Sequence, residues 1–120
     1  MDAAAADRTY NRVVWLENDG SESFTEHTIK GDFAGARCVF AIDLDGDTDV
    51  DVLGAAYDAD DITWWENTAG DGSVWTEHTV DGDFDAAHSV HSADMDGDGD
   101  MDVLGASWVY AIAWWENTTG

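Results

Sequence analysis

The sequence repeats itself with a period of about fifty residues, and this period limits the folds that the chain can adopt. Short motifs occur twice with an offset of 50 or 51 residues: TEHT at 25–28 and 76–79, GDF at 31–33 and 82–84, DVLGA at 51–55 and 102–106, and WWENT at 64–68 and 114–118. WLEN at 15–18 is a looser third copy of the last motif. A period of this length is typical of propellers and solenoids, in which each repeat is one supersecondary unit.

Each repeat contains segments with the pattern of β-strands. Proline is absent, and Gly, Asp and Asn mark turns at intervals of roughly 8–12 residues. No segment shows the sustained helical spacing of apolar residues. The expected strands are 12–17, 24–29, 36–42, 50–57, 62–66, 75–80, 87–93, 101–108 and 111–116. About four strands per repeat match a propeller blade, so we predict an all-β fold with blades of four antiparallel strands and about two blades per chain.

The predicted strands divide the chain into complete and partial blades. We expect an N-terminal tail at 1–11, the last two strands of a blade at 12–30, a full blade at 31–80, and a second blade without its outermost strand at 81–120. Two blades cannot close a ring, because propellers typically have about 4–8. The ring is therefore completed by flanking blades outside this sequence or by head-to-tail assembly of copies, as a trimer or tetramer.

Two short stretches place an aspartate at every second position. DLDGDTDVD spans residues 43–51 and DMDGDGDMD spans 94–102, and Asp-Gly pairs in both indicate hairpin turns. A turn gathers carboxylates around one point, where like charges require a cation or must bind protons. Many oxygen ligands in a flexible loop suit Ca²⁺ better than Mg²⁺. We predict about one Ca²⁺ per loop and two per chain, the alternative being an acidic hairpin on a salt-adapted surface.

The spacing matches part of an EF-hand calcium loop. Counted from Asp94, aspartates fall on positions 1, 3, 5, 7 and 9, and Gly99 falls on position 6, where the chain turns sharply. Position 12 is Gly105 instead of a bidentate Glu, so the last aspartate of each loop is the candidate for that role. The first loop has Thr48 at position 6, and Thr tolerates a left-handed turn less well than Gly, so we expect weaker binding there.

The pattern D-x-D-G-D-x-D-x-D followed by a V-L-G strand resembles the FG-GAP/VCBS repeat family, which includes the calcium-loop blades of integrin α-subunit propellers. The resemblance extends over the chain from about Arg12, and the W-W-E-N motif and the long period strengthen it. It implies a β-propeller with calcium in the loop between the two inner strands of each blade. The ligands that it implies are Asp43, Asp45, Asp47, the Asp49 carbonyl and Asp51, and in the second loop Asp94, Asp96, Asp98, the Asp100 carbonyl and Asp102. Rings of this family have more blades than this chain supplies.

The charge of the chain excludes some partners. With 27 acidic and 4 basic residues, the formal net charge is −23, so nucleic acid and anionic membrane surfaces would be repelled. Either a high-salt environment or ordinary solubility accounts for the charge outside the two loops. The acidic N-terminus is unlike a signal peptide. We expect an extracellular or cell-surface location for the parent protein, whose signal lies outside this sequence.

Several functions agree with these features. The first is a non-enzymatic, calcium-stabilised propeller module that assembles with copies of itself. The second is a carbohydrate-binding propeller in which Trp108 and Tyr110, beside an expected turn, contact a glycan; a protein ligand is a further alternative. The Trp pairs at 64–65 and 114–115 are interpreted as packing between blades, because neighbouring strand residues face opposite sides. An enzyme is disfavoured, since no Ser/His/Asp set or P-loop is evident. The last interpretation is a chain cut or designed to study propeller assembly.

Overall fold

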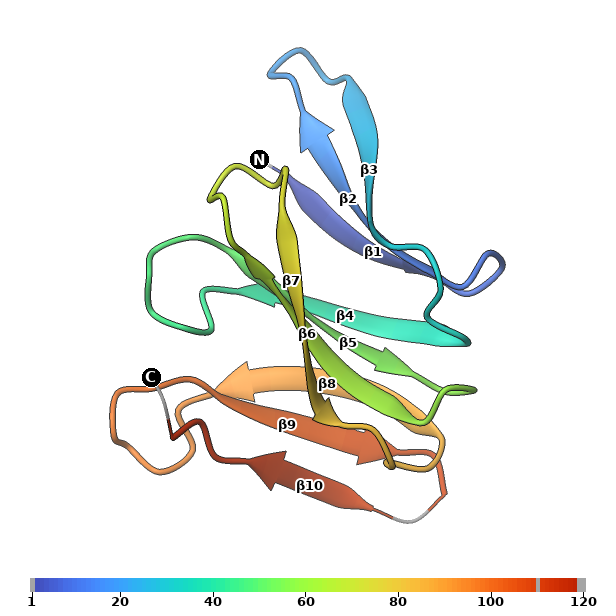
Figure 1. The fold of residues 1–120 in the computed structure, drawn as a ribbon, viewed down its shortest axis with the longest axis vertical. Coiled ribbons are helices and arrows are strands. Elements are labelled where there is room, and N and C mark those ends of the chain that lie inside the picture. Colours follow the sequence, from blue (N-terminus) through green and yellow to red (C-terminus); the bar gives the residue numbers. More distant parts are fainter. Residues whose placement is uncertain (1, 110, 119–120) are drawn as a thin grey trace.

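The computed structural model describes residues 2–109 and 111–118, and these residues form ten strands in three antiparallel sheets (Figure 1). The strands are β1 (Ala3–Asp7), β2 (Arg12–Asn18), β3 (Phe24–Lys30), β4 (Ala36–Ile42), β5 (Asp51–Ala56), β6 (Asp61–Asn67), β7 (Trp75–Asp81), β8 (Ala87–Ala93), β9 (Asp102–Ser107) and β10 (Ile112–Trp115). The sheet orders are β1-β2-β3, β4-β5-β6-β7 and β10-β9-β8. The all-β prediction is confirmed, and each sheet is a propeller-like blade of consecutive strands.

The first sheet contains one strand more than the sequence pattern indicated. Residues 3–7 fall in the segment that we expected to be an N-terminal tail, but they form β1 and pair with β2, from Ala3 opposite Leu16 to Asp7 opposite Arg12. Alanine is a weak strand former, and AAAAD has no alternation of apolar and polar residues. Residues 3–7 therefore adopt a strand conformation because they pair with β2, and not because of their own strand propensity.

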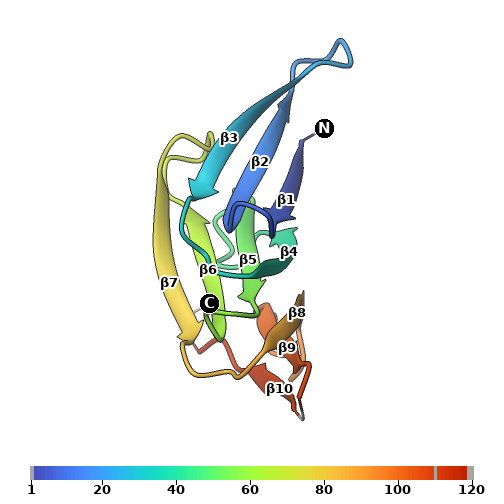
Figure 2. The ribbon, with the colours of Figure 1, turned by 90° about the vertical axis from the view of Figure 1, so that its right-hand side faces the viewer.

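The three sheets follow one another along the longest axis of the molecule in sequence order (Figure 1). The strand β4 contacts β8 on one side and β1 on the other, and Figure 2 shows these three strands along the same side of the molecule, opposite β7. The middle sheet is thus covered on both faces. No helix among the described residues is long and apolar enough to span a membrane.

Two apolar clusters hold the stack together, one at each junction between sheets. All six residues of β5 are buried, because Val52 and Ala56 face the first sheet while Leu53 and Ala55 face the third. The first junction contains Val13, Phe33, Ala36, Val52, Ala56 and Trp65. The second junction contains Leu44, Leu53, Ala55, Ile62, Phe84, Ala87, Val90 and Val103.

The Trp pair of the middle sheet packs as the sequence predicts. Trp65 is 2% exposed, and its ring meets that of Phe33 edge-on with centroids 5.0 Å apart, whereas Trp64 packs against the other cluster. In the third sheet only half of this arrangement is present, because Trp115 packs inward while Trp114 is 45% exposed. The outer face of the third sheet is therefore uncovered among the described residues.

The repeat supplies a matched pair of variants that tests the packing. Ile62 is fully buried, and Ile112, at the same position of the next repeat, is 89% exposed. We expect Ile62→Ala to lower the free energy of unfolding by about 2–5 kcal/mol, because it leaves a cavity. Ile112→Ala should change it by less than about 0.5 kcal/mol in the monomer. Urea denaturation at low protein concentration measures both changes. Equal losses of unfolding free energy in the two variants would contradict the order of the three sheets, in which the third sheet covers Ile62 but no described sheet covers Ile112.

Candidate metal centre

The first Asp loop, residues 43–51, connects β4 to β5 and wraps around one carboxylate. Asp43 Oδ1 accepts hydrogen bonds from the backbone N–H groups of Gly46 at 2.9 Å and Asp47 at 3.1 Å, and Oδ2 accepts one from Thr48 at 2.9 Å. Thr48 has a left-handed backbone, with φ of 78°. Because the loop folds back on its own first residue, side chains that would alternate along a strand converge instead.

The second Asp loop, residues 94–102, connects β8 to β9 and repeats this geometry. Asp94 Oδ1 accepts hydrogen bonds from the N–H groups of Gly97 at 2.8 Å and Asp98 at 3.2 Å, and Oδ2 accepts one from Gly99 at 2.9 Å. Gly99 adopts φ of 95°, a conformation that favours glycine. The two loops therefore differ mainly in the residue that carries the left-handed turn.

The last aspartate of the first loop is buried and joins the loop to the body of its sheet. Asp51 is 1% exposed. Its Oδ2 accepts a hydrogen bond from Leu44 N at 3.0 Å, within the loop, and its Oδ1 accepts one from Asn67 N at 2.9 Å, at the end of β6. A buried carboxylate with two backbone donors is satisfied as an acceptor, so it fixes the loop against the third strand of the sheet.

Asp102 has the same role in the second loop. It is 0% exposed, and it accepts hydrogen bonds from Met95 N at 2.9 Å and Asn117 N at 2.8 Å. The side chain of Asn117 also reaches the preceding sheet, where its Nδ2 donates to the carbonyl of Leu44 at 3.2 Å. Each loop is thus part of the junction between sheets as well as part of its own sheet.

The carboxylates of each Asp loop converge, in one group in the first loop and in two groups in the second. In the first loop one oxygen from each of four residues lies within 4.8 Å of the others: Asp43, Asp45, Asp47 and Asp51. In the second loop the same holds for two overlapping sets: Asp94, Asp96 and Asp102, and Asp96, Asp98 and Glu116. Neither set includes the carboxylates of Asp49 and Asp100, whose expected contribution is a backbone carbonyl.

Glu116 is the acidic residue that sequence reasoning missed. Its repeats at Glu17 and Glu66 suggested a structural role, and Glu66 does bond to His78 at 3.0 Å. The signal that identifies Glu116 is its neighbour Asn117, whose backbone N–H holds the last aspartate of the loop. A residue next to that contact lies at the mouth of the loop.

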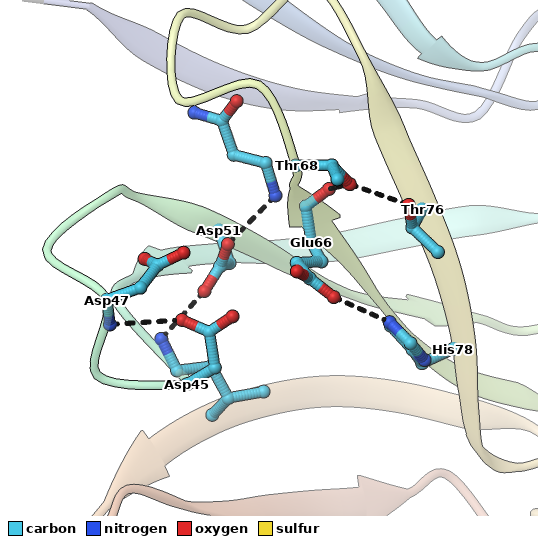
Figure 3. A network of polar contacts seen from close by, with 9 residues as sticks. Asp45, Asp47, Asp51, Glu66, Thr68, Thr76 and His78 are labelled. Carbon is cyan, nitrogen blue, oxygen red and sulfur yellow. Dashed lines mark hydrogen bonds and ion pairs between the residues drawn. The ribbon is translucent and has the colours of Figure 1, made fainter.

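The surroundings of the loops penalise negative charge. The pKa of Asp45 is raised to about 6, first by desolvation and then by the charge of Asp51. Burial also raises the pKa of Asp51, and desolvation raises that of Asp96. In Figure 3 the carboxylates of Asp45, Asp47 and Asp51 lie close to one another. Four carboxylates without a soft ligand fit a hard divalent cation such as Ca²⁺, which would offset this repulsion.

The family comparison matches most of the chain. The model of the FG-GAP-like repeat family matches residues 1–54 and 43–105, and both matched segments include Asp-loop residues. The chain belongs to the FG-GAP-like repeat family. Repeats of this family are blades of β-propellers and commonly bind calcium. Searches of curated proteins and of solved structures gave no significant match.

Of the two aromatic residues proposed as ligand contacts, Trp108 lies among the residues that the structure describes. Trp108 is 66% exposed, and its ring stacks on that of His88 with centroids 5.3 Å apart. Tyr110 lies outside the described residues. A role of either residue in binding stays a prediction.

The difference between the two FG-GAP-like loops is testable at Thr48. A left-handed residue other than Gly costs roughly 1–2 kcal/mol. The added freedom of Gly in the unfolded chain costs roughly 0.5–1 kcal/mol. We therefore expect Thr48→Gly to raise the free energy of unfolding by about 0.5–1 kcal/mol and to strengthen Ca²⁺ binding in the first loop. Urea denaturation in chelator and calcium titration measure the two effects.

The reciprocal change is the control. Gly99→Thr should destabilise the second loop, where nothing lies within 4 Å of an added Cβ, so the loss reports backbone strain alone. Stabilisation by Gly99→Thr, or a loss of stability with Thr48→Gly, would contradict the strain argument.

Proposed function

We propose that the chain is a non-enzymatic, calcium-binding β-propeller module that serves as a structural and interaction scaffold and assembles with copies of itself into a ring. The observation that carries the proposal is the convergence of carboxylate oxygens to within 4.8 Å of one another in both loops, above a buried aspartate. A chain with 27 acidic residues places such clusters at a high energetic cost unless they bind cations. An extracellular location, where calcium is abundant, agrees with this function.

The aspartates of each loop have different roles in the proposed calcium site. Asp51 and Asp102 accept backbone hydrogen bonds with both carboxylate oxygens and so fix the loop to its sheet. Asp43 and Asp94 accept hydrogen bonds from backbone N–H groups within the same loop, and these bonds shape the turn. The remaining acids, Asp45, Asp47, Asp96 and Asp98, are bound less extensively and present oxygens to the cation. Bound calcium would supply the positive charge that these groups lack.

The uncovered outer face of the third sheet supports assembly. Ile112 and Trp114 are exposed there, although their counterparts in the middle sheet, Ile62 and Trp64, pack under the next sheet. A second copy stacked head to tail would cover this face with its first sheet. Each chain contributes three sheets, so the sheets of a dimer would already be enough for a propeller, which has about 4–8 blades. The trimer or tetramer was expected from two blades per chain.

Calcium removal tests the metal site. Ligand that binds only the folded state stabilises it by roughly 2.7 kcal/mol at a hundredfold excess over Kd. We expect excess chelator to lower the melting temperature, and Asp98→Ala to weaken binding in the second loop only. Asp100→Ala is the matched control, because it removes the same charge from the same loop without removing a clustered carboxylate. Calorimetric calcium titration compares the variants, and equal effects, or no effect of chelator, would contradict the site.

Self-assembly is tested by native mass spectrometry in calcium. We expect the wild-type chain to form a closed oligomer, and Ile112→Asp to shift it toward the monomer by placing a charge on the uncovered face. Val74→Asp is the control, because Val74 is 53% exposed and lies in the β6–β7 connection. A wild-type chain that stays monomeric at every concentration contradicts assembly without affecting the calcium proposal.

Carbohydrate binding is the second candidate function. The observation in its favour is Trp108, whose indole is 66% exposed beside His88 and offers a stacking surface for a sugar ring. A glycan array distinguishes this function, because a selective signal that is lost in Trp108→Ala supports it.

A further inference from the structure

The side chain of Asn117 connects the two Asp loops across the second junction. Its Nδ2 donates hydrogen bonds to the carbonyl of Met101, in the second loop, at 3.1 Å, and to the carbonyl of Leu44, in the first loop, at 3.2 Å. Its backbone N–H donates to Asp102 Oδ1 at 2.8 Å. Both loops lie on the same side of the stack of sheets (Figure 1), and this one residue, just after β10, contacts both of them.

These bonds form a continuous path between the two buried carboxylates. Asp51 Oδ2 accepts a hydrogen bond from Leu44 N at 3.0 Å. The carbonyl of Leu44 accepts from Asn117, whose backbone N–H binds Asp102. The same carbonyl belongs to the peptide that leads into Asp45, one of the clustered acids of the first loop. The path therefore begins at backbone groups that shape the first loop and ends on the aspartate that fixes the second.

Apolar packing accompanies this path. Leu44 is 6% exposed and belongs to the same buried cluster as Val103, and Met101 packs against that cluster. A cavity of about 230 Å³ adjoins it, with a lining that includes Asp45 of the first loop and Glu116, which clusters with acids of the second. Because closely packed groups transmit displacements, a change in the shape of one loop reaches the other.

The first junction provides a matched residue without the bridge. Asn67 stands at the position of Asn117 in the preceding repeat, and its backbone N–H binds Asp51 in the same way, at 2.9 Å. Its side-chain oxygen accepts a hydrogen bond from Gly72 N at 2.9 Å, within the β6–β7 connection. In the part of the chain that the structure describes, its side chain donates to neither Asp loop. Asn67 therefore separates the effect of the backbone bond from the effect of the bridge.

We propose that Asn117 is a positioning residue that couples the two Asp loops, so that Ca²⁺ in either loop strengthens Ca²⁺ binding in the other. The inference rests on the proposed calcium function. The bridge requires the Leu44 carbonyl and Asp102 to be held in place together. A loop that is ordered by an ion holds its end of the bridge, so the other loop loses less conformational freedom when it binds. Linkage makes this effect reciprocal.

Electrostatic repulsion acts in the opposite direction. An ion in one loop lowers the negative potential at the other loop and so weakens its attraction for a second ion. In 1 M salt the Debye length falls to about 3 Å, which screens this term and leaves the bridge. The net contribution of one hydrogen bond corresponds to about a two- to tenfold change in an equilibrium constant, and this sets the expected size of the coupling.

A double-mutant cycle on the full chain in 1 M KCl measures the coupling. In an NMR titration with Ca²⁺, the backbone amides of Gly46 and Gly99 report the first and the second loop separately. Asp47→Ala removes a clustered carboxylate of the first loop. We expect it to weaken Ca²⁺ binding at Gly99 by about two- to tenfold in the wild-type background and to have no effect at Gly99 in the Asn117→Ala background. In the matched Asn67→Ala background the effect of Asp47→Ala should persist.

Hydrogen exchange in excess chelator tests the bridge without any bound ion. Asn117→Ala keeps the backbone N–H that binds Asp102 and removes only the side-chain donor. We expect the amides of Leu44 and Met95, which bind the two buried aspartates, to exchange about two- to tenfold faster in this variant. The amide of Ala55, in the core, should keep its rate.

A third measurement needs no substitution at position 117. Asp98→Ala disables the second loop, and filling of the first loop should still shift the side-chain amide signals of Asn117. Asn117 signals that do not move overturn the inference. An affinity at Gly99 that is the same with and without Asp47→Ala, or an effect of Asp47→Ala that is undiminished in Asn117→Ala, overturns it as well. Loops that bind no Ca²⁺ in the wild-type chain overturn the proposed function instead, and the exchange rates in chelator still decide whether the bridge joins the loops.

Discussion

The structure depends on a buried carboxylate at the end of each Asp loop. Asp51 and Asp102 are almost fully buried, and each accepts one backbone N–H from its loop and one from a second residue: Asn67 at the end of β6 for Asp51, and Asn117 just after β10 for Asp102. These bonds convert a flexible acidic turn into a fixed part of the blade. Because Asn117 also donates to the carbonyl of Leu44, the same contact sets how successive sheets stack.

That arrangement creates an electrostatic problem that the protein alone does not solve. The loop brings the other carboxylates within 4.8 Å of one another, and the raised pKa of Asp45, about 6, reflects desolvation and the charge of Asp51. In the proposed function, a bound cation would convert this repulsion into attraction at the point where two neighbouring strands are joined. Metal binding, loop shape and blade packing would then be parts of one interaction.

Sequence reasoning located most of this architecture because the repeat carries it. The bounds of β4 and β8 agree with the predicted segments, since apolar alternation ends at an Asp loop in both. It missed β1, whose alanines have no pattern. Glu116 was missed because its role depends on where β10 ends relative to the second loop, which only tertiary structure fixes.

The most direct measurement is a crystal structure grown in calcium, with anomalous scattering used to identify bound ions. The account predicts one ion in each loop, with the oxygens of Asp45 and Asp47 among its ligands in the first and those of Asp96 and Asp98 in the second. Loops that fold as described here but contain no ion in saturating calcium would contradict it.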